Sequence, residues 1–191
     1  MKRDRSAITP LTILTPIRPG EKRELEAYLA QLPRDEDGPF RRLSSTHFAR
    51  WAIIDRLASD YAGAPFPVQP LRMSYLLFTS TFNGPVREYV EELRVRLGAE
   101  ADAVWGHCVN YPGHRRPGPF RRYLLHNRVP VHLWYPAYDA TVTEVRAAVE
   151  LRRRHIEFAR CVQELDDDKD LQRAFVEEFG GVSHGRAARV A

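Results

Sequence analysis

RMSYLLFTSTF, residues 72–82, is the stretch that decides the fold. It is rich in aromatic and β-branched residues and predicts a β-strand, which the turn residues Asn83, Gly84 and Pro85 end. Upstream, HFARWAIID (residues 47–55) predicts a strand with apolar residues on both faces, as in a strand covered on both sides. Near the start of the chain, AITPLTILTPI (residues 7–17) predicts a first strand with prolines near its ends.

Helical patterns surround these strands. PGEKRELEAYLAQL (residues 19–32) predicts a helix after the first strand, and a second helix is predicted from Pro85 with an interruption at Gly98. A short helix is predicted at residues 120–127, and VHLWY (residues 131–135) predicts a fourth strand. A long helix (residues 141–165) and a short one (residues 170–179) follow.

This order predicts an α+β fold of the ferredoxin-like type. We expect a βαββαβ antiparallel sheet with helices packed on one face and extra C-terminal helices. The other face would expose apolar side chains, and either the long helix or a second subunit would cover it; we expect a homodimer. The side chains expected on that face are Tyr75, Leu77, Trp51 and Trp134.

The length and composition suit one domain. We expect a flexible leader at residues 1–6, a single domain over residues 7–179 and a flexible tail at residues 180–191. We expect no membrane span, because no apolar run reaches about 18 residues, and no secretory signal. Cys108 and Cys161 are too few for a disulfide framework, which favours a cytoplasmic location with reduced thiols.

Residues 103–138 contain no Asp or Glu, but they contain five arginines and four of the seven histidines. A folded surface ordinarily mixes both charge signs, so this segment is a candidate site for an anion or a metal. The alternative is a basic surface loop, because charge clusters are most often solvated faces. The net charge of +4 is modest, and nucleic acid is not the partner that we expect.

The phosphate-loop, serine-hydrolase and zincin signatures are absent from the sequence. The candidate residues are therefore considered one by one. Arg50 stands on a strand among apolar residues, where its charge needs an anion or a carboxylate such as Asp55. His107 and Cys108 offer a reactive pair, or else a turn residue beside a buried thiol. His155 interrupts the apolar stripe of the long helix, as a haem ligand or as a histidine satisfied by the backbone.

Several blocks resemble those of known proteins. In order, these blocks are HFARW (47–51), LLFTSTFNG (76–84), WGHC (105–108), YPG (111–113) and the helix at 141–159. They are similar to blocks in a group of poorly characterised bacterial ferredoxin-like α+β proteins. That group is distantly similar to the dye-decolorising peroxidase and chlorite dismutase superfamily. The resemblance spans about residues 47–160 and implies the same fold, with haem as the cofactor. The Gly-x-x-Asp-Gly motif of the dye-decolorising peroxidases is absent from this chain.

Resemblance and spacing together give one expected function, a haem-dependent oxidoreductase of the peroxidase-like type acting on a small organic substrate. His155 would be the metal ligand, Arg121 and Arg122 would contact the haem propionates, and the catalytic residues would be Arg50 and His107.

Two alternatives stay open. One is a non-haem small-molecule-binding or tailoring protein with a pocket between the sheet and the long helix. Its expected lining is Tyr75, Phe78, Trp51 and Trp134, with Arg50, His107 and His132 at the rim. The other is a basic interaction module, because residues 114–128 interleave arginines with aromatic residues as RNA-binding segments do.

Overall fold

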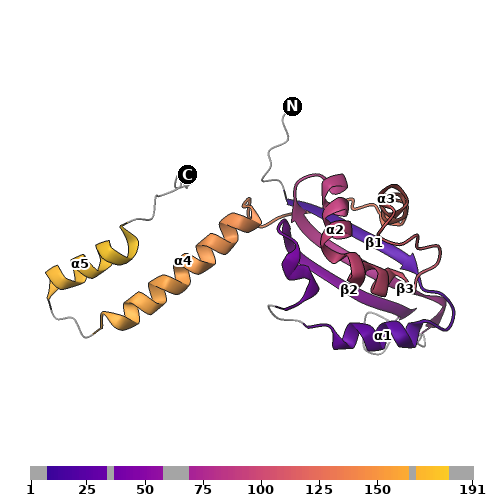
Figure 1. Ribbon diagram of the computed structural model, residues 1–191, viewed down its shortest axis with the longest axis horizontal. Coiled ribbons are helices and arrows are strands. Elements are labelled where there is room, and N and C mark those ends of the chain that lie inside the picture. The colour runs from indigo at the N-terminus through magenta and orange to yellow at the C-terminus, as the bar shows by residue number, and fades with distance from the viewer. Residues whose placement is uncertain (1–7, 34–36, 58–68, 164–166, 181–191) are drawn as a thin grey trace. The chain divides into compact units, whose positions relative to one another are not determined.

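The computed structural model describes residues 8–33, 37–57, 69–163 and 167–180. The chain divides into two compact units, Met1–Thr143 and Glu144–Ala191. The first unit holds the sheet and its helices, and the second holds the two C-terminal helices (Figure 1). The expected leader (residues 1–6) and nearly all of the expected tail (residues 180–191) lie outside the described residues.

The first unit is built on a four-stranded sheet with the order β2-β3-β1-β4. The strands are β1 (Ile8–Pro16), β2 (Thr46–Leu57), β3 (Gln69–Asn83) and β4 (Arg128–Val129). Every neighbouring pair is antiparallel, and the long strand β3 lies between β1 and β2. The predicted α+β class and antiparallel sheet are therefore confirmed, and the stretch at residues 72–82 forms an interior strand.

Strict alternation along β3 separates the two faces of the sheet. Leu76, Phe78 and Phe82 are 0% exposed, whereas Leu77 and Thr79 are half-buried. The buried set faces the helices, and we call the opposite side the open face. The rule that successive side chains point to opposite faces thus fixes the direction of each strand residue once β3 is placed.

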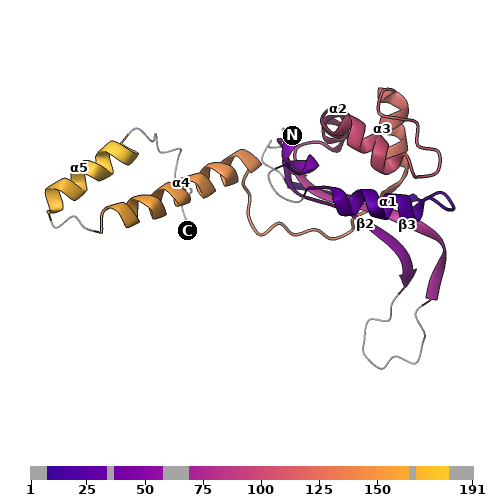
Figure 2. The same cartoon turned by 60° about the horizontal axis from the view of Figure 1, so that its bottom comes forward.

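Helices cover the buried face. They are α1 (Lys22–Gln31), the short 3-10 helix η1 (Pro39–Arg42), α2 (Val86–Trp105) and α3 (Pro117–His126). Figure 2 shows α2 and α3 together on one side of the strands, while the segment after β4 runs along the other side. The core joins strand and helix aromatics: Trp105 meets Phe78 at 5.4 Å and Trp51 at 5.8 Å between ring centroids. Gly98 has non-helical backbone angles inside α2, in agreement with the predicted interruption.

The fourth strand differs from its prediction. Residues 131–135 form no strand; β4 is confined to Arg128–Val129, which pair with Ile13 and Thr12. Pro130 follows directly and has no N–H to donate to a ladder, so the pairing stops there. The alternation in VHLWY reflects an extended segment over the open face, in which Leu133 is 90% and Tyr135 82% exposed.

The second unit contains α4 (Val142–Cys161), whose first residues Val142 and Thr143 belong to the first unit, and α5 (Asp168–Phe179). The side chain of Asp167 accepts a hydrogen bond from the N–H of Lys169 and caps α5. Ring contacts between Phe158 and Phe179, 5.4 Å apart, join the two helices. The expected single domain over residues 7–179, with the long helix over the sheet, stays a prediction. No helix in the described ranges has the length and apolar character that a bilayer span requires.

Candidate functional site

Arg50 lies on the open face of the sheet. It pairs with Thr79 in the register of β2 and β3, and its Nε donates a hydrogen bond to Thr79 Oγ1 at 3.1 Å. The carboxylate of Asp55, which the sequence offered as a partner, is bound instead by Lys22. Among the described residues, the Nη groups of Arg50 have no hydrogen bond or ion pair. The hydrogen bond through Nε therefore orients the guanidinium, and both Nη groups point away from that bond, where an anion could accept from them.

A shallow groove of about 440 Å³ runs beside Arg50 on this face. Its lining includes Thr12 and Thr81 from the strands, and Val131 and Trp134 from the segment after β4. Such a volume lies within the range of small-molecule sites. The groove offers apolar surface, hydroxyl groups and one cation, which suits a flat molecule with an acidic group.

The pocket lining expected from the sequence is divided between the two faces. Trp51 packs against the helices, with its ring 4.3 Å from that of Phe40, and Phe78 is 0% exposed on the same side. Trp134 lines the groove on the open face. Trp51 and Phe78 consequently cannot line a pocket on the open face, and Trp51 does not contribute to the apolar surface expected there.

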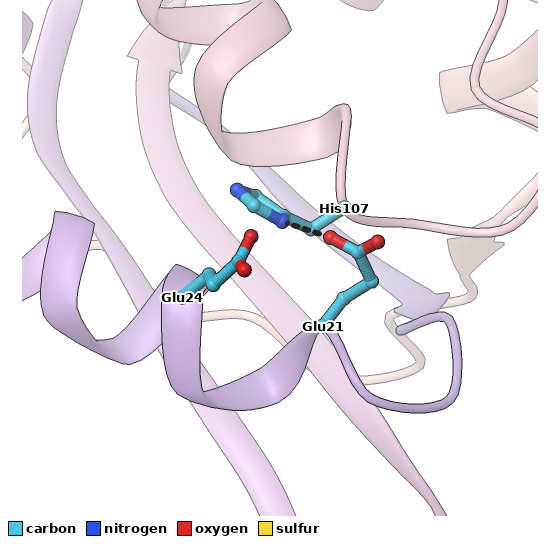
Figure 3. A group of neighbouring side chains, drawn as sticks. All are labelled: Glu21, Glu24 and His107. Carbon is cyan, nitrogen blue, oxygen red and sulfur yellow. Dashed lines mark hydrogen bonds and ion pairs between the residues drawn. The ribbon is translucent and has the colours of Figure 1, made fainter.

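His107 lies at the end of α2 in a cluster with two glutamates (Figure 3). Its Nδ1 is 2.7 Å from Glu21 Oε2, and the Glu24 carboxylate points toward the same ring. The hydrogen bond with His107 lowers the pKa of Glu21, with a smaller contribution from the charge of Arg18. Within the described residues this is the one group of three or more acidic, His or Cys side chains whose ligand atoms, all within 4.8 Å, could hold a cation.

The contacts around His107 also give the cluster a structural role. Arg18 donates through Nη2 to the carbonyl of Gly106 at 2.6 Å and through its backbone N–H to the carbonyl of His107 at 2.9 Å. The guanidinium of Arg18 lies 3.7 Å from Glu21, where it competes with any cation. These bonds tie the turn after β1 to the end of α2. The predicted catalytic role of His107 stays a prediction.

Arg121 and Arg122 lie on α3, which packs on the helix-covered face. They are exposed, and the structure does not bring them near Arg50, which faces the opposite way. Arg50, His107 and the arginine pair therefore occupy three separate places in the first unit. Arg50 lies on a strand and the others lie on or beside separate helices, and spacing along the chain does not say which elements the fold brings together.

His155 lies in the second unit. Its side chain is exposed, and its ring is 5.5 Å from that of Phe179. Arg154 is held by Glu178 at 2.7 Å, beside the same aromatic cluster. The structure thus places His155 against α5, and its expected role as an iron ligand stays a prediction.

Two further polar clusters were missed by sequence reasoning. Asp102 on α2 accepts hydrogen bonds from the Tyr111 hydroxyl and the His114 backbone N–H, both at 2.8 Å, and pairs with His114 Nδ1 at 2.6 Å. Burial acts to raise the pKa of Asp102, but the bonds from His114 and Tyr111 outweigh it and lower the pKa. The cluster fixes the loop between α2 and α3. The sequence contained an indication of this cluster. Residues 103–138 contain no acid, so a carboxylate that pairs with a histidine of that segment has to come from another part of the chain.

The second cluster surrounds Cys108, whose partner Thr15 the sequence did not predict. The thiol is 1% exposed and lies 3.3 Å from the hydroxyl of Thr15 on β1. Burial raises the pKa of Cys108 to about 11. The interpretation of Cys108 as a buried thiol is confirmed, and burial shifts its pKa in the direction opposite to that of an activated thiolate.

No protein-family model matches the chain, and no solved structure gives a significant match.

Proposed function

We propose that the chain binds a small, flat, acidic organic molecule in the groove on the open face, with Arg50 holding the acidic group. The supporting observation is the oriented guanidinium at the edge of a groove of about 440 Å³. Guanidinium groups bind carboxylates through two parallel hydrogen bonds, and apolar walls such as Trp134 accommodate a ring.

The narrower proposal is that this molecule is haem and that the chain is a peroxidase-like haem-dependent oxidoreductase. Bound haem would supply redox chemistry at its iron. The apolar side chains of the groove would face the ring, and Arg50 would bind one propionate. Among the described residues, the groove lining includes no histidine, cysteine, methionine or tyrosine. His155, the proposed iron ligand, belongs to the second unit and is not among the described lining residues, and Arg121 and Arg122 would not contact a haem in this groove.

We infer the ferredoxin-like topology that the resemblance implies from the order of the strands and helices. The antiparallel order β2-β3-β1-β4, with a helix between β1 and β2 and helices between β3 and β4, agrees with a ferredoxin-like arrangement.

We infer a homodimer, because Phe48 is 71% exposed on the open face beside the exposed segment after β4. A cytoplasmic location is inferred from the free thiols of Cys108 and Cys161. Light scattering after size exclusion tests the dimer, and a single-chain mass would contradict it.

A visible absorption spectrum of the purified protein with added haem tests the narrower proposal. We expect a Soret band with a one-to-one endpoint, its loss in His155→Ala and weaker haem binding in Arg50→Gln. The change Arg72→Gln removes the same charge from another exposed arginine near the start of β3 and is the matched control. A spectrum without a Soret band would refute haem as the ligand.

The second candidate is a non-haem small-molecule-binding protein. It is favoured because the described residues of the groove lining include no iron ligand. Native mass spectrometry of the protein purified from cells would then show a bound organic molecule without iron. Arg50→Gln would release it, whereas His155→Ala would retain it. Retention of the molecule by Arg50→Gln would refute the groove as the site for either ligand.

A further inference from the structure

The exposed face of α3 carries a paired arginine motif. Gly118, Arg121, Arg122 and Leu125 are spaced three, four and seven residues from the first, so they share one side of the helix. Phe120 and Leu124 on the other side are 0% exposed in the core. Packing of these two apolar side chains thus holds both arginines outward.

A hollow of about 460 Å³ lies over this face of α3. Arg87, from the first turn of α2, and His126, from the last turn of α3, complete its polar lining. In the part of the chain that the structure describes, every ionisable side chain of the lining is a base and no carboxylate lines the hollow. Three guanidinium groups around one hollow repel one another unless an anion or salt lies between them.

Several other arginines in the described ranges are neutralised by a carboxylate. Arg42 pairs with Glu100 and Arg154 with Glu178 at 2.5 and 2.7 Å, respectively. Arg87, Arg121 and Arg122 make no hydrogen bond or ion pair within the described ranges.

An acid close to this group is already engaged. Glu91 receives hydrogen bonds from both Nε and Nη2 of Arg94, which lower its pKa, and the charge of Arg121 adds a smaller effect. Glu91 is therefore held mainly by Arg94 on its own helix and offsets the charge of Arg121 only in part.

We propose that this hollow between α2 and α3 binds a small molecule that carries a phosphate or pyrophosphate group. Guanidinium groups match phosphate oxygens in geometry and charge. Single-stranded nucleic acid is the less favoured ligand, because its bases stack on exposed aromatic rings. Phe120 is buried, and Tyr123 packs its ring 5.5 Å from that of Tyr111. The site lies on the helix-covered side and is independent of the groove beside Arg50.

Calorimetric titration of the full chain with inorganic pyrophosphate at low ionic strength tests this proposal. We expect saturable binding that weakens roughly ten-fold in Arg122→Gln and in Arg87→Gln, which alter two different helices. Arg96→Gln removes the same charge from an exposed position on α2 outside the hollow and is expected to change binding by less than about two-fold. Far-UV circular dichroism confirms that each variant is folded.

Three results would overturn the proposal. They are the absence of saturable binding, equal losses in Arg96→Gln and Arg122→Gln, and a single-stranded oligonucleotide that binds more tightly than pyrophosphate through the same arginines. The last result would assign the hollow to nucleic acid. None of them bears on the groove, because Arg50 is unchanged in every variant.

Discussion

The thiol of Cys108 illustrates how its surroundings, more than its neighbours in sequence, set the chemistry of a residue. His107 is adjacent to it, but the histidine bonds to Glu21, while the thiol is enclosed beside Thr15. The alternative of a buried thiol was predictable from the sequence, but its partner was not, because Thr15 is 93 residues away. The same holds for Glu21, 86 residues from His107: pairs joined only by the fold leave no pattern along the chain.

Cys108 should be unreactive in the folded protein. With a pKa of about 11, roughly one thiol in a thousand is ionised at pH 8, and it is also enclosed. The exposed Cys161 should react readily. Alkylation followed by mass spectrometry should therefore give one modified thiol in the native protein and two in urea. Cys161→Ser should give none before denaturation; rapid native modification of this variant would contradict the enclosed position of Cys108.

Asp102 should stabilise the fold in a pH-dependent way. Its pKa is lowered from 3.8 in the folded state, so its contribution is present above that value and is lost as the pH falls through the folded pKa. We expect Asp102→Asn to lower the free energy of unfolding by about 1 kcal/mol at pH 7, after allowance for solvent screening. The difference in stability from wild type should disappear in strong acid. Urea unfolding at several pH values measures both. Asp139→Asn is the control at an exposed position, and an equal cost there would exclude a specific role for Asp102.

At the scale of elements, periodicity predicted the sheet well where strands are long. The register of β2 places Arg50 opposite Thr79 on the open face and Trp51 opposite Phe78 on the other, whereas Trp51 was expected on the open face. The fourth strand was misplaced because two paired residues are too few to give a periodic signal, whereas residues 131–135 alternate without pairing. Partner strands, which the local sequence does not specify, decide whether an extended segment becomes a strand.

The turn between β3 and α2 should depend on Gly84. Its φ of +97° lies in the region that side chains with a Cβ disfavour, although a Cβ added there would meet no atom within 4 Å. Gly84→Ala should therefore cost about 1–2 kcal/mol through the backbone alone. Gly118→Ala in α3 meets equally open space without a positive φ and should be neutral or slightly stabilising. Equal effects of the two changes on urea unfolding would contradict this assignment.

At the scale of the whole molecule, the distribution of charge was only partly foreseeable. The acid-free segment was predicted to hold one anion or metal site. In the structure its histidines and arginines go to different places: His107 bonds to Glu21, His114 to Asp102, and Arg121 and Arg122 face solvent over α3. Acidic residues from outside the segment neutralise part of it, while the hollow over α3 keeps an excess of positive charge.

The two compact units should unfold independently in the absence of ligand. All three tryptophans, at positions 51, 105 and 134, lie in the first unit, so their fluorescence reports on that unit alone. A chain that ends at Thr143 keeps Val142, whose N–H bonds to Asn83 Oδ1 at 2.8 Å. We expect its fluorescence transition in urea to superimpose on that of the full chain, while its far-UV helical signal decreases. A lower midpoint for the shortened chain would instead favour the single domain, with the long helix stabilising the sheet.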